Sequence, residues 1–278
     1  MLKKLITVVL ILIITFVLTV FTQVGGVVFL IALLFHRFIK RKLSNRWLRY
    51  TASLFLFLAL YLMAVFIFVP ILAKPFGRVP LPMFERDHVK PVTILTCLLN
   101  RNYVRPELKI ITMQVAAHMN KQYPGTVLNY LDANFPFVDE FPLWPHLSHD
   151  DGRKLDLSFL YTDVSTGEPS SEVPSFIGYG VCEEPKPGEE NRPAFCAQQG
   201  YWQYSFMSGI VSQSRKAELV FDPSRTKSMI NNFVRQSGIG KILIEPHLKS
   251  RLRLTSRKIR LHGCQAVRHD DHIHIQLR

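Results

Sequence analysis

The chain has 278 residues and a net charge of +13 at pH 7, from 34 Lys and Arg against 21 Asp and Glu. The length allows one or two domains, and the charge alone would fit a nucleic-acid-binding protein. However, residues 1–78 hold ten of the basic residues and no acidic one, which leaves 24 basic against 21 acidic residues for the rest. The excess charge therefore lies beside apolar segments, and we expect no nucleic-acid partner.

Two apolar runs dominate the first part of the chain. Residues 5–35 are 31 positions without a charge, and residues 50–73 form a second run of 24. A single helix of 31 residues would be about 46 Å long, against a hydrocarbon core of about 30 Å. We therefore expect the first run to tilt or to break at "QVGG", residues 23–26. A signal peptide fused to a span is the alternative, although no A-x-A-like site follows its first half.

The loop between the two runs is strongly basic. Residues 36–49 carry six Lys and Arg and no acid. Short loops of this composition stay in the cytoplasm, so the second run should carry everything after it across the membrane. Lys3 and Lys4 favour a cytoplasmic N-terminus, in which case the first run crosses twice as a hairpin. The sequence thus predicts two or three spans within residues 1–78, a linker at 79–90 and an extracytoplasmic domain at 91–278.

Beyond the linker, the spacing of apolar residues predicts a mixture of helices and strands. We expect helices at 105–123 and 223–238, the second with Ser224 as N-cap and Gly238 at its end, and a structured insertion at 163–213. The expected strands cover residues 125–135, 154–161, 216–221, 241–248, 258–263 and 271–277. This order has no βαβ rhythm and predicts an α+β fold, with a small antiparallel sheet core and flanking helices.

All four cysteines lie beyond the second apolar run, where an oxidising compartment would permit disulfides. Cys182 and Cys196 flank a polar loop and are the expected pair, which leaves Cys97 and Cys264 to pair by elimination. Four free thiols in a cytosolic domain are the alternative.

A first histidine cluster lies where a loop enters a predicted strand. In "WPHLSHDDGRKLDLSF", six residues separate His149 from Asp156, and Gly152 is one of them. Gly152 lets the chain turn, and Asp156 then enters the strand on the face opposite Leu155 and Leu157. A histidine and a carboxylate are thereby expected on one side of the sheet.

The segment "HDDHIHIQLR" at the end of the chain carries the second cluster. His272 and His274 are two apart, so both point to one face of a strand while the isoleucines point to the core. Two imidazoles and a carboxylate, with a fourth position left to water, are a typical catalytic zinc set. The candidate ligands are therefore His149, Asp156 and one histidine of this pair, and the other could move protons beside the metal. The neighbouring aspartates are expected to be solvated or to orient imidazole N–H groups: Asp150, Asp151, Asp270 and Asp271.

The two clusters together resemble the signatures of the penicillin-insensitive murein endopeptidases, within the lysostaphin-like and D-alanyl-D-alanine carboxypeptidase-like zinc peptidases. "HLSHDDGRKLD" is similar to the His-six residues-Asp signature and "HDDHIH" to the His-x-His signature, each with a further histidine three positions ahead. The resemblance implies one zinc ion (Zn²⁺) per chain on His149, Asp156 and His274, with His272 as the catalytic residue. It also implies that His146 and His269 support the site or bind substrate.

In function, the resemblance implies hydrolysis of peptide cross-links in peptidoglycan by a domain on the outer side of the cytoplasmic membrane. A D-alanyl carboxypeptidase acting on the same substrate is one alternative, and an inactive, metal-dependent cell-wall binding module is another. Two features depart from the resemblance. Members of that branch are commonly soluble periplasmic proteins, and positions 271 and 273 hold Asp and Ile where aromatic side chains are usual.

Overall fold

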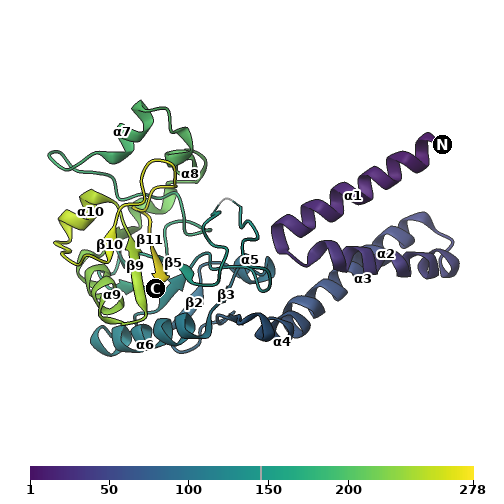
Figure 1. The fold of residues 1–278 in the computed structure, drawn as a ribbon, viewed down its shortest axis with the longest axis horizontal. Helices are drawn as coiled ribbons and strands as arrows, with labels where there is room; N and C mark the ends of the chain where they lie inside the picture. The colour runs from purple at the N-terminus through teal and green to yellow at the C-terminus, as the bar shows by residue number, and fades with distance from the viewer. Residues whose placement is uncertain (145) are drawn as a thin grey trace.

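The computed structural model describes residues 1–144 and 146–278. It is 47% helical and 14% strand, with small sheets and an apolar N-terminal helix, in agreement with the predicted α+β class. In Figure 1 the N-terminal helices extend to one side, and the mixed part of the chain lies on the other.

Three consecutive apolar helices open the chain: α1 (Leu2–Thr22), α2 (Gly25–Lys42) and α3 (Arg46–Met63). The first apolar run breaks within the predicted stretch, where Gln23 has a φ of 64°. Helices α1 and α2 then pack against each other as a hairpin. A Cβ at Gly26 would lie 2.1 Å from Oγ1 of Thr19, so this close approach requires glycine.

Two helical stretches, Leu2–Thr22 and Arg46–Leu72, are long and apolar enough to cross a membrane. The second stretch continues from α3 through a π-helical segment (Ala64–Phe68) into α4 (Val69–Leu72). Few of their side chains are buried within the molecule, unlike those of a core helix in a soluble protein. They indicate membrane association or, for the first, a signal sequence. The side of the membrane on which the rest of the chain lies stays a prediction.

A six-stranded sheet with the order β10-β9-β11-β5-β4-β2 forms the centre of the second part. Its strands are β2 (Val89–Pro91), β4 (Leu128–Tyr130), β5 (Lys154–Ser158), β9 (Ile239–Leu243), β10 (Ile259–Arg260) and β11 (His272–Leu277). Strand β11 runs antiparallel to β5 and β9, but β2 is parallel to β4 and β10 is parallel to β9. The central pairs β9–β11, β11–β5 and β5–β4 thus form the predicted antiparallel core, but the pairs at both edges of the sheet are parallel. There, α6 (Pro106–Gln122) and α10 (Pro246–Arg251) act as crossovers that return the next strand in the same direction.

Shorter elements complete the domain. They are β1 (Val79–Pro80), β3 (Tyr103–Val104), β6 (Tyr161–Asp163), β7 (Pro169–Ser170), β8 (Leu219–Phe221), α5 (Ile94–Leu98), α7 (Arg192–Gln198) and α8 (Phe206–Ile210). Strand β1 pairs with β3, and β6 lies between β7 and β8. Residues 79–90, predicted as a linker, thus supply β1 and the start of β2, and they pack against the domain.

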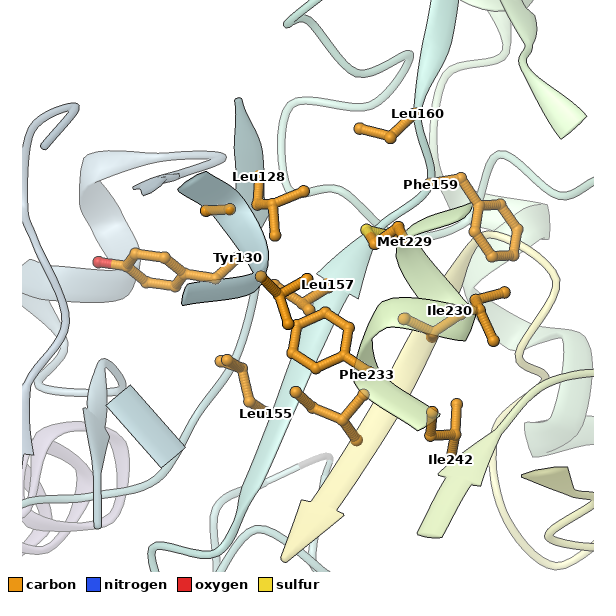
Figure 2. Packing of buried hydrophobic residues seen from close by; sticks show 14 of the residues in the cluster. Leu128, Tyr130, Leu155, Leu157, Phe159, Leu160, Met229, Ile230, Phe233 and Ile242 are labelled. Atoms are coloured by element: carbon orange, nitrogen blue, oxygen red, sulfur yellow. The ribbon is translucent and has the colours of Figure 1, made fainter. Parts of the chain in front are cut away.

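Helix α9 (Pro223–Arg235) covers the apolar face of the sheet. Asp222, rather than the predicted Ser224, is its N-cap, because the Asp222 side chain accepts the backbone N–H of Arg225 and Pro223 begins the helix. The helix ends before Gly238. Figure 2 shows its buried side chains against those of β5 and β9: Met229, Ile230 and Phe233 on the helix, and Leu155, Leu157 and Ile242 on the sheet.

The structure corrects the predicted disulfides. Cys196 and Cys264 are bonded, with Cα atoms 5.3 Å apart, whereas Cys97 and Cys182 are free and buried. The predicted pairs Cys182–Cys196 and Cys97–Cys264 are therefore wrong. The short separation of Cys182 and Cys196 in the sequence favoured the wrong pair. Cys196 lies on α7, and its bond to Cys264 brings it to the connection between β10 and β11. The bond ties the insertion to the segment that leads into β11.

Candidate metal centre

The pairing of β5 with β11 places the histidines opposite the carboxylate. His274 lies directly across from Asp156, and His272 lies across from Ser158. Ile273 and Ile275 are fully buried in the hydrophobic core on the other face, as the alternation of the sequence predicts.

Three donor atoms converge at this point of the sheet. Nε2 of His149 lies 3.2 Å from Oδ1 of Asp156 and 3.0 Å from Nδ1 of His274. Nδ1 of His274 lies 2.9 Å from the same carboxylate oxygen. Tetrahedral ligands bound to zinc at about 2.0–2.1 Å are about 3.3–3.4 Å apart. The triangle is therefore close to the size that one zinc ion would span.

The tautomer of His149 adds to this fit. Its Nδ1 donates a hydrogen bond to the carbonyl oxygen of Ala133 at 2.6 Å, so in the neutral ring Nε2 presents a lone pair. That lone pair faces a carboxylate oxygen of Asp156, and both residues are buried. Two lone pairs that face each other without water need a proton or a metal ion between them. The donor set thus fits a cation.

His146 engages the other side of the same carboxylate. Its Nδ1 lies 3.0 Å from Oδ2 of Asp156. The ligand atoms of His146, His149 and Asp156 all lie within 4.8 Å of one another, so this buried group could hold a metal ion. Two overlapping sets therefore share His149 and Asp156 and differ in whether His146 or His274 is the third member. The shorter separations are those to His274.

His272 has one nitrogen held and the other free. Its Nδ1 donates to Asp271, while Nε2 is buried 3.8 Å from Oδ2 of Asp156 and has no hydrogen-bond partner in the described part of the chain. Burial lowers the pKa of His272, but the charges of Asp271 and Asp156 outweigh it and raise the pKa to about 9. By contrast, burial is the largest influence on His274 and lowers its pKa to about 4.

Tyr179, from the insertion, is a site residue that the sequence did not reveal. Its hydroxyl donates to Oδ2 of Asp156 at 2.8 Å and also lies 3.3 Å from Asp132. Its ring packs against those of His146 and His272, with centroids 4.6 and 4.9 Å away. The insertion has no regular period, so no sequence pattern distinguished this tyrosine from its neighbours.

Asp156 receives contacts on both oxygens. Burial would raise its pKa, but the charges of His149 and His272 and the hydrogen bond from His146 hold the pKa well below its usual range. The carboxylate therefore stays ionised, as a metal ligand must be.

His269 lies beside the site rather than at the carboxylate. Its buried ring is 4.9 Å from that of His272, centroid to centroid. Its backbone N–H donates to Glu245 at 3.1 Å, and the same Glu245 oxygen accepts the hydroxyl of Tyr204 from the insertion. Burial and the charge of Asp270 raise the pKa of Glu245 to about 7.

The loop that carries His149 needs Gly152, as the sequence predicts. Gly152 has a φ of 77°, and a Cβ there would lie 1.7 Å from Nη1 of Arg78. The aspartates on this loop do not orient imidazoles: Asp150 and Asp151 both accept hydrogen bonds from Lys154. Of the four neighbouring aspartates, Asp271 contacts an imidazole N–H, while Asp270 pairs with Arg268.

A small pocket opens beside His146 and His272. The insertion forms much of its wall through Tyr179, Tyr204 and Met207, and Arg268 also lines it. The insertion is therefore part of the site, and the pocket has a volume of about 10 Å³, room for about one water molecule beside His272.

No protein-family model matches the chain, and a search of curated proteins finds no significant match.

Proposed function

We propose that the chain is a membrane-anchored zinc peptidase that hydrolyses peptide cross-links in peptidoglycan outside the cytoplasm. The main support is that His149, Asp156 and His274 bring three donor atoms within 3.2 Å of one another, beside a histidine with a free nitrogen. Three protein ligands and an adjacent acid–base group are the pattern of a catalytic zinc site. The resemblance of both histidine signatures to murein endopeptidases supports the substrate class.

The protein's own contacts orient the ligands. When bound, zinc supplies the Lewis acidity that activates water and polarises a peptide carbonyl at neutral pH. The Ala133 carbonyl holds the ring of His149 so that Nε2 faces the metal position. His146 and Tyr179 occupy Oδ2 of Asp156, which leaves Oδ1 for the metal.

His272 is the proton carrier in this proposal. Asp271 holds the proton on Nδ1, so Nε2 is the atom that exchanges protons. Because its pKa is raised to about 9, Nε2 carries a proton at neutral pH; it would stabilise the charge that develops on the carbonyl oxygen and deliver this proton to the leaving amine as the peptide C–N bond breaks.

Arg268 favours an endopeptidase over a carboxypeptidase. An arginine in the pocket could receive the terminal carboxylate of a D-alanyl substrate. However, its guanidinium already pairs with Asp270 and with Glu184 at 2.8 Å. The charge is therefore neutralised within the protein, and a substrate without a free carboxylate suits this pocket better.

The proposed topology follows from the basic loop and the packing of the helices. The first apolar run enters the membrane as the hairpin of α1 and α2, in which Leu2–Thr22 is long enough to cross, and Arg46–Leu72 crosses after the basic loop. With residues 36–49 in the cytoplasm, the zinc domain lies on the periplasmic or extracellular side. A reporter that works only outside the cytoplasm, fused after residue 278, should be active, and a cytoplasm-only reporter at the same place should be silent. The reverse result would exclude a cell-wall substrate.

The decisive test uses the full chain in detergent, loaded with zinc, and measures cleavage of cross-linked and uncross-linked muropeptides. We expect cross-linked dimers to give monomers. His272→Ala should keep its zinc and be slower by about 10² to 10⁴. His118→Ala, an exposed change on α6, should behave as wild type. Release of terminal D-alanine alone would favour the carboxypeptidase, and metal-dependent binding without cleavage would favour the inactive module.

A further inference from the structure

A cavity of about 180 Å³ lies where the Arg46–Leu72 helix meets the zinc domain. The helix contributes Val65, Phe66 and Pro70 to its wall, and the domain contributes Leu81, Met83 and Cys97 among others. Val65 and Phe66 belong to the π-helical segment between α3 and α4. The cavity is separate from the pocket beside His272.

Most of the lining is apolar, and two of its polar side chains, Cys97 and Asn102, are bonded within the protein. Sγ of Cys97 lies 3.2 Å from the hydroxyl of Tyr130, and Nδ2 of Asn102 donates to the carbonyl oxygen of Leu81 at 3.2 Å. Water in such a space would find few partners, and apolar cavities of about 150 Å³ in proteins stay dry and take up small hydrocarbons. An empty cavity of this size also forfeits packing. Its chemistry therefore suits a hydrocarbon ligand.

The position of the cavity indicates where the hydrocarbon comes from. About 20 helical residues cross the hydrocarbon core, so a span that begins near Arg46 has its far boundary close to residues 65–70. Phe66 is 39% exposed, on the same helix as the exposed Leu58 and Leu62 that would face lipid. Lys74 is exposed just beyond the end of the span, at the level of phosphate head groups. The cavity thus continues the lipid-facing surface of the helix into the domain.

We propose that this cavity binds the end of one acyl chain of a membrane phospholipid, with the phosphate near Lys74. The inference rests on Arg46–Leu72 lying in a membrane and is independent of the zinc site. The bound chain would fill the junction where the domain already meets the helices, through the hydrogen bond from the Tyr61 hydroxyl to Leu98 at 2.6 Å and that from Asn100 to Thr22 at 3.1 Å. The bound chain would thereby stabilise the packing of the domain against the N-terminal helices.

Cys97 is the reporter for this site, because it is 3% exposed and belongs to the domain rather than to a span. The full chain is placed in nanodiscs that contain phosphatidylglycerol with a diazirine near the end of one acyl chain, irradiated, and mapped by mass spectrometry. We expect lipid adducts on the exposed faces of α1 and α3 and also on Cys97. Because Cys97 lines the cavity and is almost fully buried, an adduct on it would report a lipid chain inside the cavity.

Two variants fill the cavity from opposite sides, and one matched change does not. Met83→Trp and Val65→Phe should reduce the Cys97 adduct to the background without irradiation. Phe55→Trp, at a 72% exposed position on the same helix, should leave the adduct unchanged. Labelling of α3 without labelling of Cys97 would overturn the proposal, as would a Cys97 adduct that persists in both filled variants. Absence of adducts on α3 as well would show that the helix is outside the membrane and would equally overturn it.

Discussion

One carboxylate oxygen of Asp271 accepts a hydrogen bond from Nδ1 of His272, and the other accepts a hydrogen bond from the backbone N–H of Gly180 in the insertion. A single carboxylate therefore fixes the tautomer of the proposed proton carrier and attaches it to the pocket wall. The resemblance to murein endopeptidases did not predict this contact, because an aromatic residue is usual at position 271 there.

Asp271→Asn should lower kcat by about 10- to 100-fold, since it removes the negative charge that raises the pKa of the His272 imidazole and strengthens its hydrogen bond. Zinc content should stay the same, because Asp271 does not touch the metal position. The pKa of His272 should fall from about 9, so the corresponding limb of the pH–rate profile should move to lower pH. Asp151→Asn, which removes a carboxylate bound to Lys154, is the matched control. An unchanged pH profile in Asp271→Asn would contradict the proposed role.

The third metal ligand can be assigned by comparing two histidine variants of the full chain. His274→Ala should lose zinc, because its Nδ1 lies within 3.0 Å of both other donor atoms. His146→Ala should keep zinc with about 10- to 100-fold weaker affinity, since His146 contacts the outer oxygen of Asp156. Elemental analysis after dialysis against a graded chelator measures both. If His146→Ala is the variant that loses its zinc, the ligand set is His146, His149 and Asp156.

Local periodicity explains which parts of the site the sequence could predict. Alternation in β11 puts His272 and His274 opposite the core-facing isoleucines, and the His149–Gly152–Asp156 spacing defines a turn into β5. These features depend on a few neighbouring residues. The break in the first apolar run was predictable for the same reason, because a helix of that length exceeds the hydrocarbon core.

The remaining features depend on contacts between segments far apart in the chain. Tyr179 reaches Asp156 from an aperiodic insertion, and Cys196 meets Cys264 across 68 residues. The two parallel strand pairs at the sheet edges could not be predicted from the sequence either. Strand β10 has two residues and β2 has three, too few to show an alternating pattern. Sequence spacing cannot encode such meetings without knowledge of how the insertion folds over the sheet.

The disulfide assignment predicts a thiol count. Denatured, unreduced protein should be alkylated at Cys97 and Cys182 and at neither of the other two cysteines. Cys196→Ser should lower the free energy of unfolding by up to about 4 kcal/mol, the chain-entropy value for a separation of 68 residues. Cys264→Ser and the double variant should match it, since all three remove the same bond. An additive loss in the double variant, or no alkylation at Cys97, would contradict the assigned pair.

Glu245 should make stability fall as pH rises. Burial, and then the charge of Asp270, raise its pKa from the usual 4.5 to about 7 in the folded chain. Between these values the folded state binds more protons than the unfolded state, so the free energy of unfolding decreases with pH, by roughly 3 kcal/mol in total. The stabilisation is complete below about pH 4.5 and is lost as pH rises through about 7.

Glu245→Gln keeps an oxygen for the Tyr204 hydroxyl and the His269 N–H, and it does not titrate. Denaturant unfolding of the full chain at several pH values should therefore show wild type losing stability relative to this variant as pH rises. For the control Glu190→Gln, on an exposed loop, the free energy of unfolding should change with pH as it does in wild type. Parallel curves for wild type and Glu245→Gln would show that Glu245 is already ionised in the folded protein.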